Sequence, residues 1–261
     1  MKEELKVFLT AVMFYTRIPC PSWVGHSPDY ITKSVRYFPV IGWIVGAISG
    51  LGFLFGHWLV GPWFATFFFI AISVWLTGAF HEDGFADVCD GFGGGWTKAQ
   101  ILMIMKDSRV GTYAVVGLVL LILLKASLLV KVSNQYDYID LLLVVINGHT
   151  LSRVMAATVI FTHQYVREDE QSKVKPVAKG YSTTNVVSVL LFGLIPTMVI
   201  TFIMGQLWWC FIPIPLYLVK MYLSNLFKKK IGGYTGDCLG ATQQIVEVAY
   251  YLFIVLAWKF I

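Results

Sequence analysis

The chain has 261 residues, of which 57% are hydrophobic, 16% aromatic and 13% charged, and its mean hydropathy is +0.70. Soluble globular proteins carry about 25% charged residues, so this composition excludes an ordinary soluble domain and predicts that several apolar runs lie in lipid. The net charge of +5 is typical of basic loops beside membrane spans, and nucleic acid is not expected as a partner. The four cysteines show no metal-binding or C-x-x-C spacing.

Seven apolar stretches are long enough to cross about 30 Å of hydrocarbon. Residues 5–18 are apolar on one side and are expected to form an interfacial or partly inserted helix, with an eighth short span as the alternative. The predicted fold is an all-α integral membrane protein, a single polytopic domain over residues 1–261 with a polar cavity facing the cytoplasm. The seven predicted transmembrane helices cover residues 37–60, 62–80, 111–130, 138–161, 186–204, 207–226 and 239–258.

The distribution of Lys and Arg predicts the orientation of these helices. If the N-terminus is cytoplasmic, 15 of the 20 Lys and Arg residues fall in inner segments and 2 fall in outer segments. Such a bias is typical of cytoplasmic loops. The same orientation places the acidic stretch 82–90, Asp107 and Asp237 on the cytoplasmic side, so three separated carboxylate sites share one face of the membrane.

The stretch "HEDGFADVCDGFGGG", residues 81–95, carries the clearest chemical pattern. Asp83, Asp87 and Asp90 are spaced i, i+4 and i+7, which places them along one stripe of a helix. Because like charges repel there, a cation is expected to offset them, and an all-oxygen ligand set suits Mg²⁺. The alternative is a solvated helix end that marks the membrane boundary.

The residues around these aspartates carry weaker signals. Gly94 and Gly95 lie in a glycine run that can present backbone N–H groups to a phosphate, although such runs are often flexible linkers. Glu82 lies off the aspartate stripe and is expected to face solvent or to support a ligand. His81 is expected to be a hydrogen-bonding anchor rather than a catalyst.

Two further segments place charges near the expected membrane boundary. In "MKDSRVGTYA", Lys106 and Arg109 flank Asp107. An Arg guanidinium can bind a phosphate through two hydrogen bonds, and a Lys ammonium can bind it through its charge. The alternative is that both residues are simply the basic residues that flank a membrane span on the cytoplasmic side. In "GGYTGDCLGA", glycines crowd around Asp237 directly before the last span, which favours a site over a solvated loop.

Two ionisable residues fall inside the predicted spans. Glu247 and Arg153 would be costly in hydrocarbon unless each faces a partner in the protein interior. They are interpreted as a structural ion pair with each other, with a phosphate as the alternative partner of Arg153. Arg17 and Arg36, which precede the first span, are interpreted as interface anchors, with phosphate binding as the alternative.

Five segments resemble the characteristic blocks of a single family, in the same order. They are "FYTRIP", "YFPVIGWIVG", "HEDGFADVCDGFGGG", "MKDSRVGTYA" and "GGYTGDCLGA", the last followed by Glu247. The third is similar to the signature H-x-D-G-x-x-D-x-x-D-G-x-x-G-G of cobalamin synthase, the adenosylcobinamide-GDP ribazoletransferase family. The ordered set extends from about residue 14 to residue 247 and is more specific than a lone D-G-x-x-D.

The resemblance implies a Mg²⁺-dependent enzyme that joins adenosylcobinamide-GDP to α-ribazole or its 5′-phosphate. The products would be GMP and adenosylcobalamin, or its 5′-phosphate. The protein would lie in the plasma (inner) membrane of a bacterium or an archaeon, surrounded by lipid, with its active site in the cytoplasm. A homo-oligomer is compatible with the sequence.

The match also implies residue roles. The implied metal ligands are Asp83, Asp87, Asp90 and Glu247. The implied catalytic set is Asp87, Asp90, Asp107 and Asp237, in which Asp107 or Asp237 completes the site or acts as the base. The implied phosphate ligands are Lys106 and Arg109, with Arg153, Arg17, Arg36, Gly94 and Gly95 as further candidates.

Two other classes of protein share part of this pattern. A CDP-alcohol phosphotransferase also uses spaced aspartates at a cytoplasmic membrane face, but its Ala-Arg after the second aspartate is not found in residues 84–95. A cation transporter would place acidic residues near mid-membrane, whereas most acidic residues here lie at one predicted boundary. Both remain alternatives to the transferase.

Overall fold

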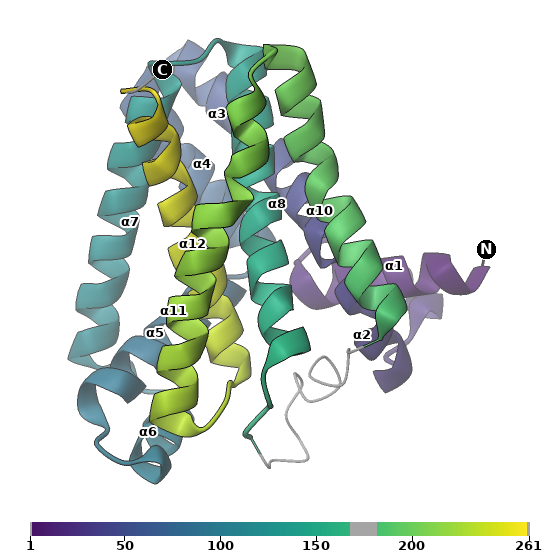
Figure 1. Ribbon diagram of the computed structural model, residues 1–261, viewed down its shortest axis with the longest axis vertical. Helices are drawn as coiled ribbons and strands as arrows, with labels where there is room; N and C mark the ends of the chain where they lie inside the picture. Colours follow the sequence, from purple (N-terminus) through teal and green to yellow (C-terminus); the bar gives the residue numbers. More distant parts are fainter. Residues whose placement is uncertain (1, 168–181, 260–261) are drawn as a thin grey trace.

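The computed structural model describes residues 2–167 and 182–259, and all the regular structure in these ranges is helical (Figure 1). The long helices are α3 (Phe38–Leu59), α7 (Thr112–Ser133), α8 (Tyr138–Thr162), α10 (Thr183–Met204), α11 (Pro213–Ile231) and α12 (Gly236–Ala257). The shorter ones are α1 (Lys2–Tyr15), α2 (Pro28–Ser34), α4 (Pro62–Thr77), α5 (Phe80–Gly94) and α6 (Lys98–Ile104). Three 3₁₀ turns complete the set: η1 (Ser22–Val24), η2 (Val35–Tyr37) and η3 (Leu207–Phe211).

Six helices are long and apolar enough to cross a membrane, and α4 with α5 adds a seventh crossing if the pair is counted as one bent span. The first of these spans, Pro28–Leu59, joins α2, η2 and α3 and begins nine residues before the predicted start at residue 37. The other five agree with the predicted spans to within five residues at each end, with η3 and α11 together forming the span predicted at 207–226. The prediction of an all-α, multi-pass membrane protein is therefore confirmed.

Helix α8 lies at the centre of the bundle, and α7 and α10 lie at its outside. In α8, 83% of the most apolar window is buried, against 28% in α7 and 22% in α10. The exposed positions of the two outer helices are large and apolar, including Leu123, Leu124, Leu191 and Phe202. An apolar surface of this kind is the expected contact with lipid tails.

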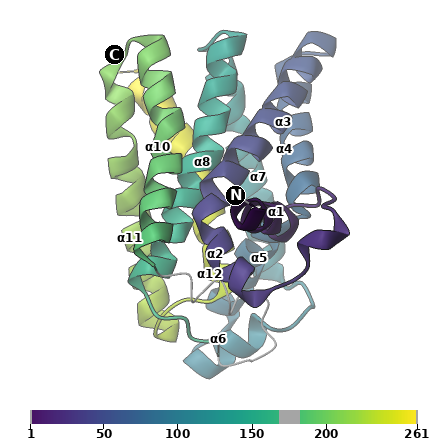
Figure 2. The same cartoon turned by 90° about the vertical axis from the view of Figure 1, so that its right-hand side faces the viewer.

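Helix α1 lies across the long axis of the bundle rather than along it (Figures 1 and 2). It packs on α2 and α3, and its buried residues include Val7, Ala11 and Tyr15. Its orientation agrees with the interfacial helix predicted at residues 5–18, and α1 is too short, at 14 residues, to span hydrocarbon about 30 Å thick.

The span predicted at 62–80 is not one straight helix. Helix α4 has 16 residues, or about 24 Å of rise, and the chain then bends by 92° into α5. The acidic motif therefore begins a separate helix, at the end of the bundle that also carries α6 (Figure 1).

Two successive left-handed residues make this bend. Gly78 has φ 64° and Ala79 has φ 59°, and Ala79 is the only non-glycine with positive φ in the described ranges. The Gly78 N–H donates to the Trp75 carbonyl at 3.2 Å, and the Ala79 N–H donates to the Val74 carbonyl at 2.9 Å. This is the Schellman pattern that closes a helix, with a backbone strain of about 1–2 kcal/mol at a non-glycine residue.

Helices α5 and α12 approach each other closely through two glycines. A Cβ on Gly84 would lie 2.9 Å from both the Cα and the carbonyl oxygen of Asp237, and one on Gly240 would lie 2.9 Å from the His81 carbonyl oxygen. Small residues are the usual means by which membrane helices bring their backbones together. This crossing brings the acidic face of α5 beside the first turn of α12.

Gly84→Ala is expected to lower the melting temperature of the detergent-solubilised protein by several degrees. The new methyl group meets the α12 backbone, which cannot move aside, and such overpacking lowers the free energy of unfolding by about 1–3 kcal/mol. In a chain of this size, each kcal/mol lowers the melting temperature by roughly 2–4 °C. Gly94→Ala is the control on the same helix, because its Cβ would meet only the Ile104 side chain, at 3.4 Å. Equal melting temperatures for the two variants would contradict the proposed crossing.

Candidate active site at the α5–α12 crossing

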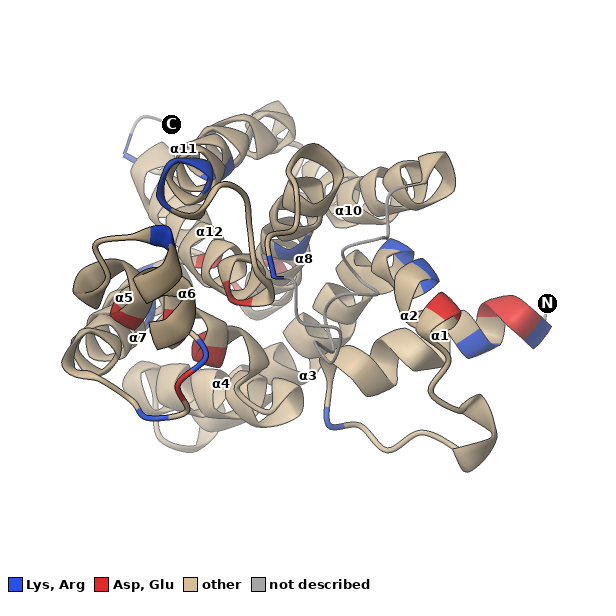
Figure 3. Ribbon diagram, turned by 90° about the horizontal axis from the view of Figure 1, so that it is seen from below, with Lys and Arg blue, Asp and Glu red and all other residues tan. Residues whose placement is uncertain are grey.

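Carboxylates from two distant parts of the sequence interact at this crossing, Asp83 and Asp87 from α5 and Asp237 from α12. Asp87 is half-buried and faces the charges of Asp237 and Asp83, and less strongly that of Asp90. The cation that opposes them is Arg167. Seen from this end of the molecule, the acidic residues of α5 and of α12 lie on adjoining helices (Figure 3). Asp237 therefore lies near the acidic stretch, and the convergence of these carboxylates on a metal ion stays a prediction.

The donor set of this cluster fits a hard cation, since carboxylate oxygens are the ligands that Mg²⁺ prefers. Asp83, Asp87 and Asp237 bring three negative charges, against one positive charge on Arg167. Within residues 2–167 and 182–259, no three His, Cys, Asp or Glu side chains already converge tightly enough to hold a metal. The metal-ligand roles of Asp83, Asp87, Asp90 and Glu247 stay predictions.

Arg167 contacts this cluster, although no motif in the sequence identifies it as a candidate site residue. Its guanidinium lies 3.2 Å from the Asp237 carboxylate and donates to the Met105 carbonyl at 3.0 Å. Its position depends on a backbone bridge between residues 163–167 and 232–235. In that bridge Val166 N–H donates to the Tyr234 carbonyl at 3.0 Å, and Tyr234 N–H donates to the Gln164 carbonyl at 2.9 Å. No local motif in the sequence marks this pairing.

Asp90 has a structural role that its spacing did not reveal. Its two carboxylate oxygens accept hydrogen bonds from the backbone N–H groups of Gly111, at 2.6 Å, and Ala114, at 2.9 Å. The carboxylate therefore caps the N-terminus of α7 from another helix, where a negative charge is favoured. Gly111 permits the contact, because a Cβ there would lie 2.6 Å from the Asp90 carboxylate.

Asp107 pairs with Arg109 rather than with the carboxylate cluster. An Arg109 guanidinium nitrogen lies 2.6 Å from the Asp107 carboxylate, and Nε donates to it at 3.0 Å. These hydrogen bonds from Arg109 lower the pKa of Asp107 to about 2. Asp107 and Arg109 line a hollow of about 450 Å³ together with Asp90 and Gly94.

The other predicted phosphate ligands lie apart from this hollow. Lys106 lines a separate pocket with Lys98 and Arg167. Gly95 is buried against α6, where a Cβ would lie 2.8 Å from both the Gly91 carbonyl oxygen and the Ile101 backbone nitrogen. Close packing therefore requires a glycine at position 95, whatever its role toward phosphate.

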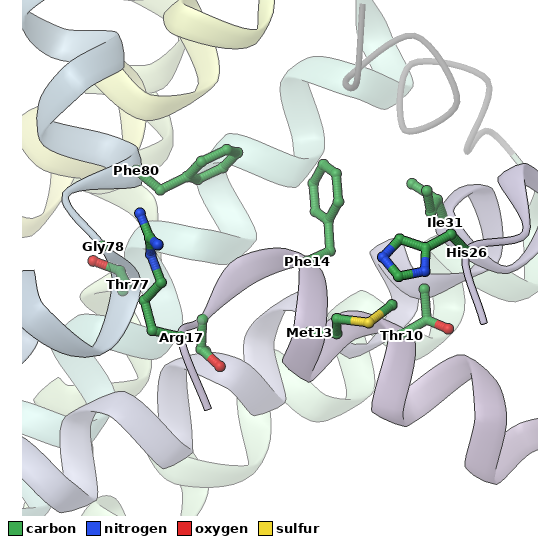
Figure 4. Close-up of a pocket in the computed structure, with 10 residues that line it drawn as sticks. Thr10, Met13, Phe14, Arg17, His26, Ile31, Thr77, Gly78 and Phe80 are labelled. Atoms are coloured by element: carbon green, nitrogen blue, oxygen red, sulfur yellow. The ribbon is translucent and has the colours of Figure 1, made fainter. Parts of the chain in front are cut away.

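Arg17 and Arg36 lie around α1. Arg17 lines a pocket of about 550 Å³ at the α4–α5 corner, where its side chain points toward Gly78 and Phe80, away from His26 (Figure 4). Arg36 is held by Asn185 at 3.0 Å and by Glu4 at 2.9 Å. None of the predicted site aspartates lines the Arg17 pocket, so the structure gives both arginines surroundings other than the carboxylate cluster.

A second polar cluster lies deep inside the bundle, around Glu247. Its carboxylate pairs with Lys125 of α7 at 3.1 Å and accepts from Gln243 at 2.8 Å, and His149 Nδ1 lies 3.6 Å away. Among the described residues, Glu247 and Arg153 form no direct salt bridge, although their charges lie close enough to interact. Arg153 instead donates to the His149 carbonyl at 2.9 Å, because the two residues are one turn apart on α8, while Lys125 reaches Glu247 from α7.

Glu82 joins this cluster and does not face solvent. It is 9% exposed and accepts a hydrogen bond from Gln244 at 2.8 Å, and Gln244 in turn accepts from Lys125 at 2.8 Å. His81 is also buried, and its Nε2 has no hydrogen-bond partner among the described residues. Glu82 is thus fixed to the buried cluster, while the next residue, Asp83, is exposed.

Glu247→Gln and Lys125→Met are each expected to destabilise the protein by about 3–5 kcal/mol, because each leaves one buried charge without its partner. The double variant is expected to lose less than the sum of the two, as residues in direct contact do in a double-mutant cycle. Melting temperatures of the four proteins in detergent measure the coupling. If Glu247 is instead a metal ligand, Glu247→Gln would raise the Mg²⁺ concentration for half-maximal activity while leaving stability unchanged.

Comparisons with known proteins agree with the ordered motifs. Residues 7–255 match the family model described as cobalamin-5-phosphate synthase. The chain is 44% identical over 256 residues to the adenosylcobinamide-GDP ribazoletransferase of Shewanella piezotolerans, covering 98% of this chain and 96% of that one. It is 43% identical over 252 residues to the protein of the same name from Shewanella frigidimarina, covering 97% and 95%.

No solved structure matches the chain significantly. The family assignment therefore depends on sequence similarity over nearly the whole length of the chain. On the family match and the level of identity, the chain belongs to the cobalamin-5-phosphate synthase family.

Proposed function

We propose that this protein transfers α-ribazole, or its 5′-phosphate, onto adenosylcobinamide-GDP and releases GMP. The observation that carries the proposal is the carboxylate cluster of Asp83, Asp87 and Asp237 beside Arg167, in a chain whose relatives bear the name adenosylcobinamide-GDP ribazoletransferase. Phosphoryl-type transfer needs charge neutralisation and positioning more than a covalent nucleophile.

In the proposed reaction a ribose hydroxyl of α-ribazole attacks the phosphorus nearest the cobinamide. A new P–O bond forms, the bond from that phosphorus to the bridging oxygen breaks, and GMP leaves with the bridging oxygen. The hydroxyl proton passes to a base or to water. Asp83, Asp87 and Asp237 would hold Mg²⁺, with Asp90 beside them; when bound, Mg²⁺ neutralises charge on the pyrophosphate and on the departing GMP.

Asp237 and Asp107 suit different tasks in this reaction. A general base works best with a pKa near the working pH, and the pKa of Asp107 is lowered to about 2 by Arg109. We therefore assign Asp107 to orienting Arg109 toward a phosphate. Asp237, which lies beside Asp87, is assigned to completing the metal site.

We also propose that the end of the molecule with the carboxylate cluster faces the cytoplasm, in the plasma membrane of a bacterium or an archaeon. Lys228, Lys229 and Lys230 at the end of α11, Lys98 of α6 and Arg167 lie at this same end (Figure 3). Basic residues at one end of a helix bundle favour the cytoplasmic side. Both substrates would then reach the site from water.

Asp87→Asn is expected to reduce GMP release from adenosylcobinamide-GDP and α-ribazole by roughly 100-fold or more, because it removes a charge from the centre of the metal-binding set. The melting temperature should stay close to that of the parent protein, since Asp87 is only half-buried. Asp29→Asn, at an exposed pair with Lys33 on α2, is the matched control and should keep full activity. Near-normal turnover by Asp87→Asn would remove Asp87 from the site.

Chelation of divalent metal by EDTA is expected to stop GMP release, and an excess of Mg²⁺ is expected to restore it. Asp83→Asn should raise the Mg²⁺ concentration needed for half-maximal activity, because one ligand charge is lost. Turnover that persists in EDTA would contradict the metal requirement. Consumption of a CDP-alcohol, or ion flux in proteoliposomes, would favour the alternative classes.

A further inference from the structure

Helix α5 carries four acidic side chains, and their contacts divide them into two pairs. Glu82 and Asp90, the first and the last of the four, accept hydrogen bonds from neighbouring helices. Asp83 and Asp87 lie between them in the sequence. Among residues 2–167 and 182–259, the carboxylates of Asp83 and Asp87 accept no hydrogen bond and form no ion pair. The outer pair is therefore engaged by protein, while the inner pair can bind a ligand.

Asp90 attaches the C-terminal half of α5 to α7. Both of its carboxylate oxygens point to the start of α7, where they accept from the Gly111 N–H at 2.6 Å and from the Ala114 N–H at 2.9 Å. Hydrogen bonds from backbone donors to an ionised carboxylate are among the stronger ones in proteins. Because both donors belong to the backbone of a long helix, the Asp90 carboxylate cannot turn toward Asp237 without breaking both bonds.

Glu82 attaches the N-terminal half of α5 to α12. Its Oε1 accepts from Gln244 Nε2 at 2.8 Å, and Gln244 is itself held by Lys125 Nζ at 2.8 Å and by Gln243 Oε1 at 2.9 Å. All four of these side chains are buried. A buried hydrogen-bond network of this kind is rigid, because each member left without a partner costs free energy.

These two attachments fix both the position and the rotation of α5. Glu82 and Asp90 are eight residues apart in the sequence, which is about 12 Å along a helix, and they are bound to two different helices. Asp83 directly follows Glu82, and Asp87 lies about one turn before Asp90. A rotation of α5 about its axis would break an attachment and move both inner carboxylates relative to Asp237.

We propose that Glu82 and Asp90 are positioning residues, which hold Asp83 and Asp87 in place for a divalent cation and do not coordinate it themselves. The inference rests on the proposed function, in which Asp83, Asp87 and Asp237 would hold Mg²⁺. The three aspartates of the motif then have different tasks, although their spacing places all three on one stripe of the helix. Groups that orient metal ligands contribute strongly to the affinity of a site for its metal.

The test is binding of Mn²⁺, followed by electron paramagnetic resonance, to the purified full-length protein in detergent. Glu82→Leu removes the acceptor for Gln244 and is expected to weaken Mn²⁺ binding by about tenfold or more, as the loss of a group that orients a metal ligand does. Glu82→Gln keeps an acceptor oxygen and should bind Mn²⁺ nearly as tightly as the parent protein. Equal weakening in both variants would mean that the charge of Glu82 is needed rather than its hydrogen bond, and would overturn the positioning role.

Gly111→Ala tests the second attachment without removing a carboxylate. Its Cβ would lie 2.6 Å from an Asp90 carboxylate oxygen, so it displaces Asp90 from α7. Mn²⁺ binding is then expected to weaken by about tenfold. If Asp90 is a metal ligand instead, the released carboxylate should bind Mn²⁺ at least as well as before, and that result would overturn the proposal.

Gly117→Ala is the matched control for Gly111→Ala. It makes the same substitution on the same helix, and its Cβ would meet the Cys89 Sγ of α5 at 2.7 Å. It therefore overpacks the contact between α5 and α7 but leaves the hydrogen bonds of Asp90 intact. Gly117→Ala should lower the melting temperature and bind Mn²⁺ like the parent protein. Weakening equal to that of Gly111→Ala would contradict a specific role of the Asp90 attachment.

GMP release by the parent protein separates this inference from the proposed function. If the parent protein releases GMP from the two substrates but Glu82→Leu and Gly111→Ala bind Mn²⁺ as it does, the positioning role is wrong and the transferase stands. If the Mn²⁺ affinities follow the expected order but GMP is never released, the positioning role stands and the transferase fails. A parent protein that binds no Mn²⁺ would have no cation site for α5 to position, and the inference would be wrong.

Discussion

The close approach of α5 to α12 is the constraint on which the rest of the site depends. Glycines at positions 84 and 240 let the two backbones meet, and helical geometry then divides the side chains of α5 between two environments. Asp83 and Asp87 emerge beside Asp237 at the open end of the bundle. Glu82, about 100° further round the helix, points inward to Gln244. This one packing contact therefore positions both the acidic cluster at the end of the bundle and the polar cluster buried around Glu247.

The buried polar cluster around Glu247 explains how α5 stays in place at the end of an apolar bundle. Lys125 and Arg153 bring two positive charges, and Glu82 and Glu247 bring two negative charges, all nine-tenths buried or more. Buried charges persist only when they are paired and hydrogen-bonded. The chain from Lys125 through Gln244 to Glu82 ties α7, α12 and α5 together. The position of the motif aspartates is thus fixed from inside the membrane-spanning region.

Much of the fold could be predicted from the sequence, because long apolar runs have few alternatives to spanning helices. The 92° corner between α4 and α5 could not be predicted, since Gly78 and Ala79 lie in an apolar run that contains no Pro or charged residue at this point. Within the site, the i, i+4, i+7 spacing identified the acidic stripe, but it gave no sign that Asp90 caps α7. The contacts of Arg167 with Asp237 and of Lys125 with Glu247 could not be predicted, because both form across the tertiary structure and no motif marks them.

The corner before α5 also bears on how the protein fits its bilayer. From Asp83 to Asp90, α5 rises by about 10 Å. Had α5 continued straight from α4, this row of acidic residues would have extended over the same distance along the α4 axis, across the membrane. Turned by 92° from α4, the row lies parallel to the membrane plane when α4 lies along the membrane normal. Bilayers differ in thickness by a few Å, and a level row of charge can stay among the headgroups of each without any of its members entering hydrocarbon.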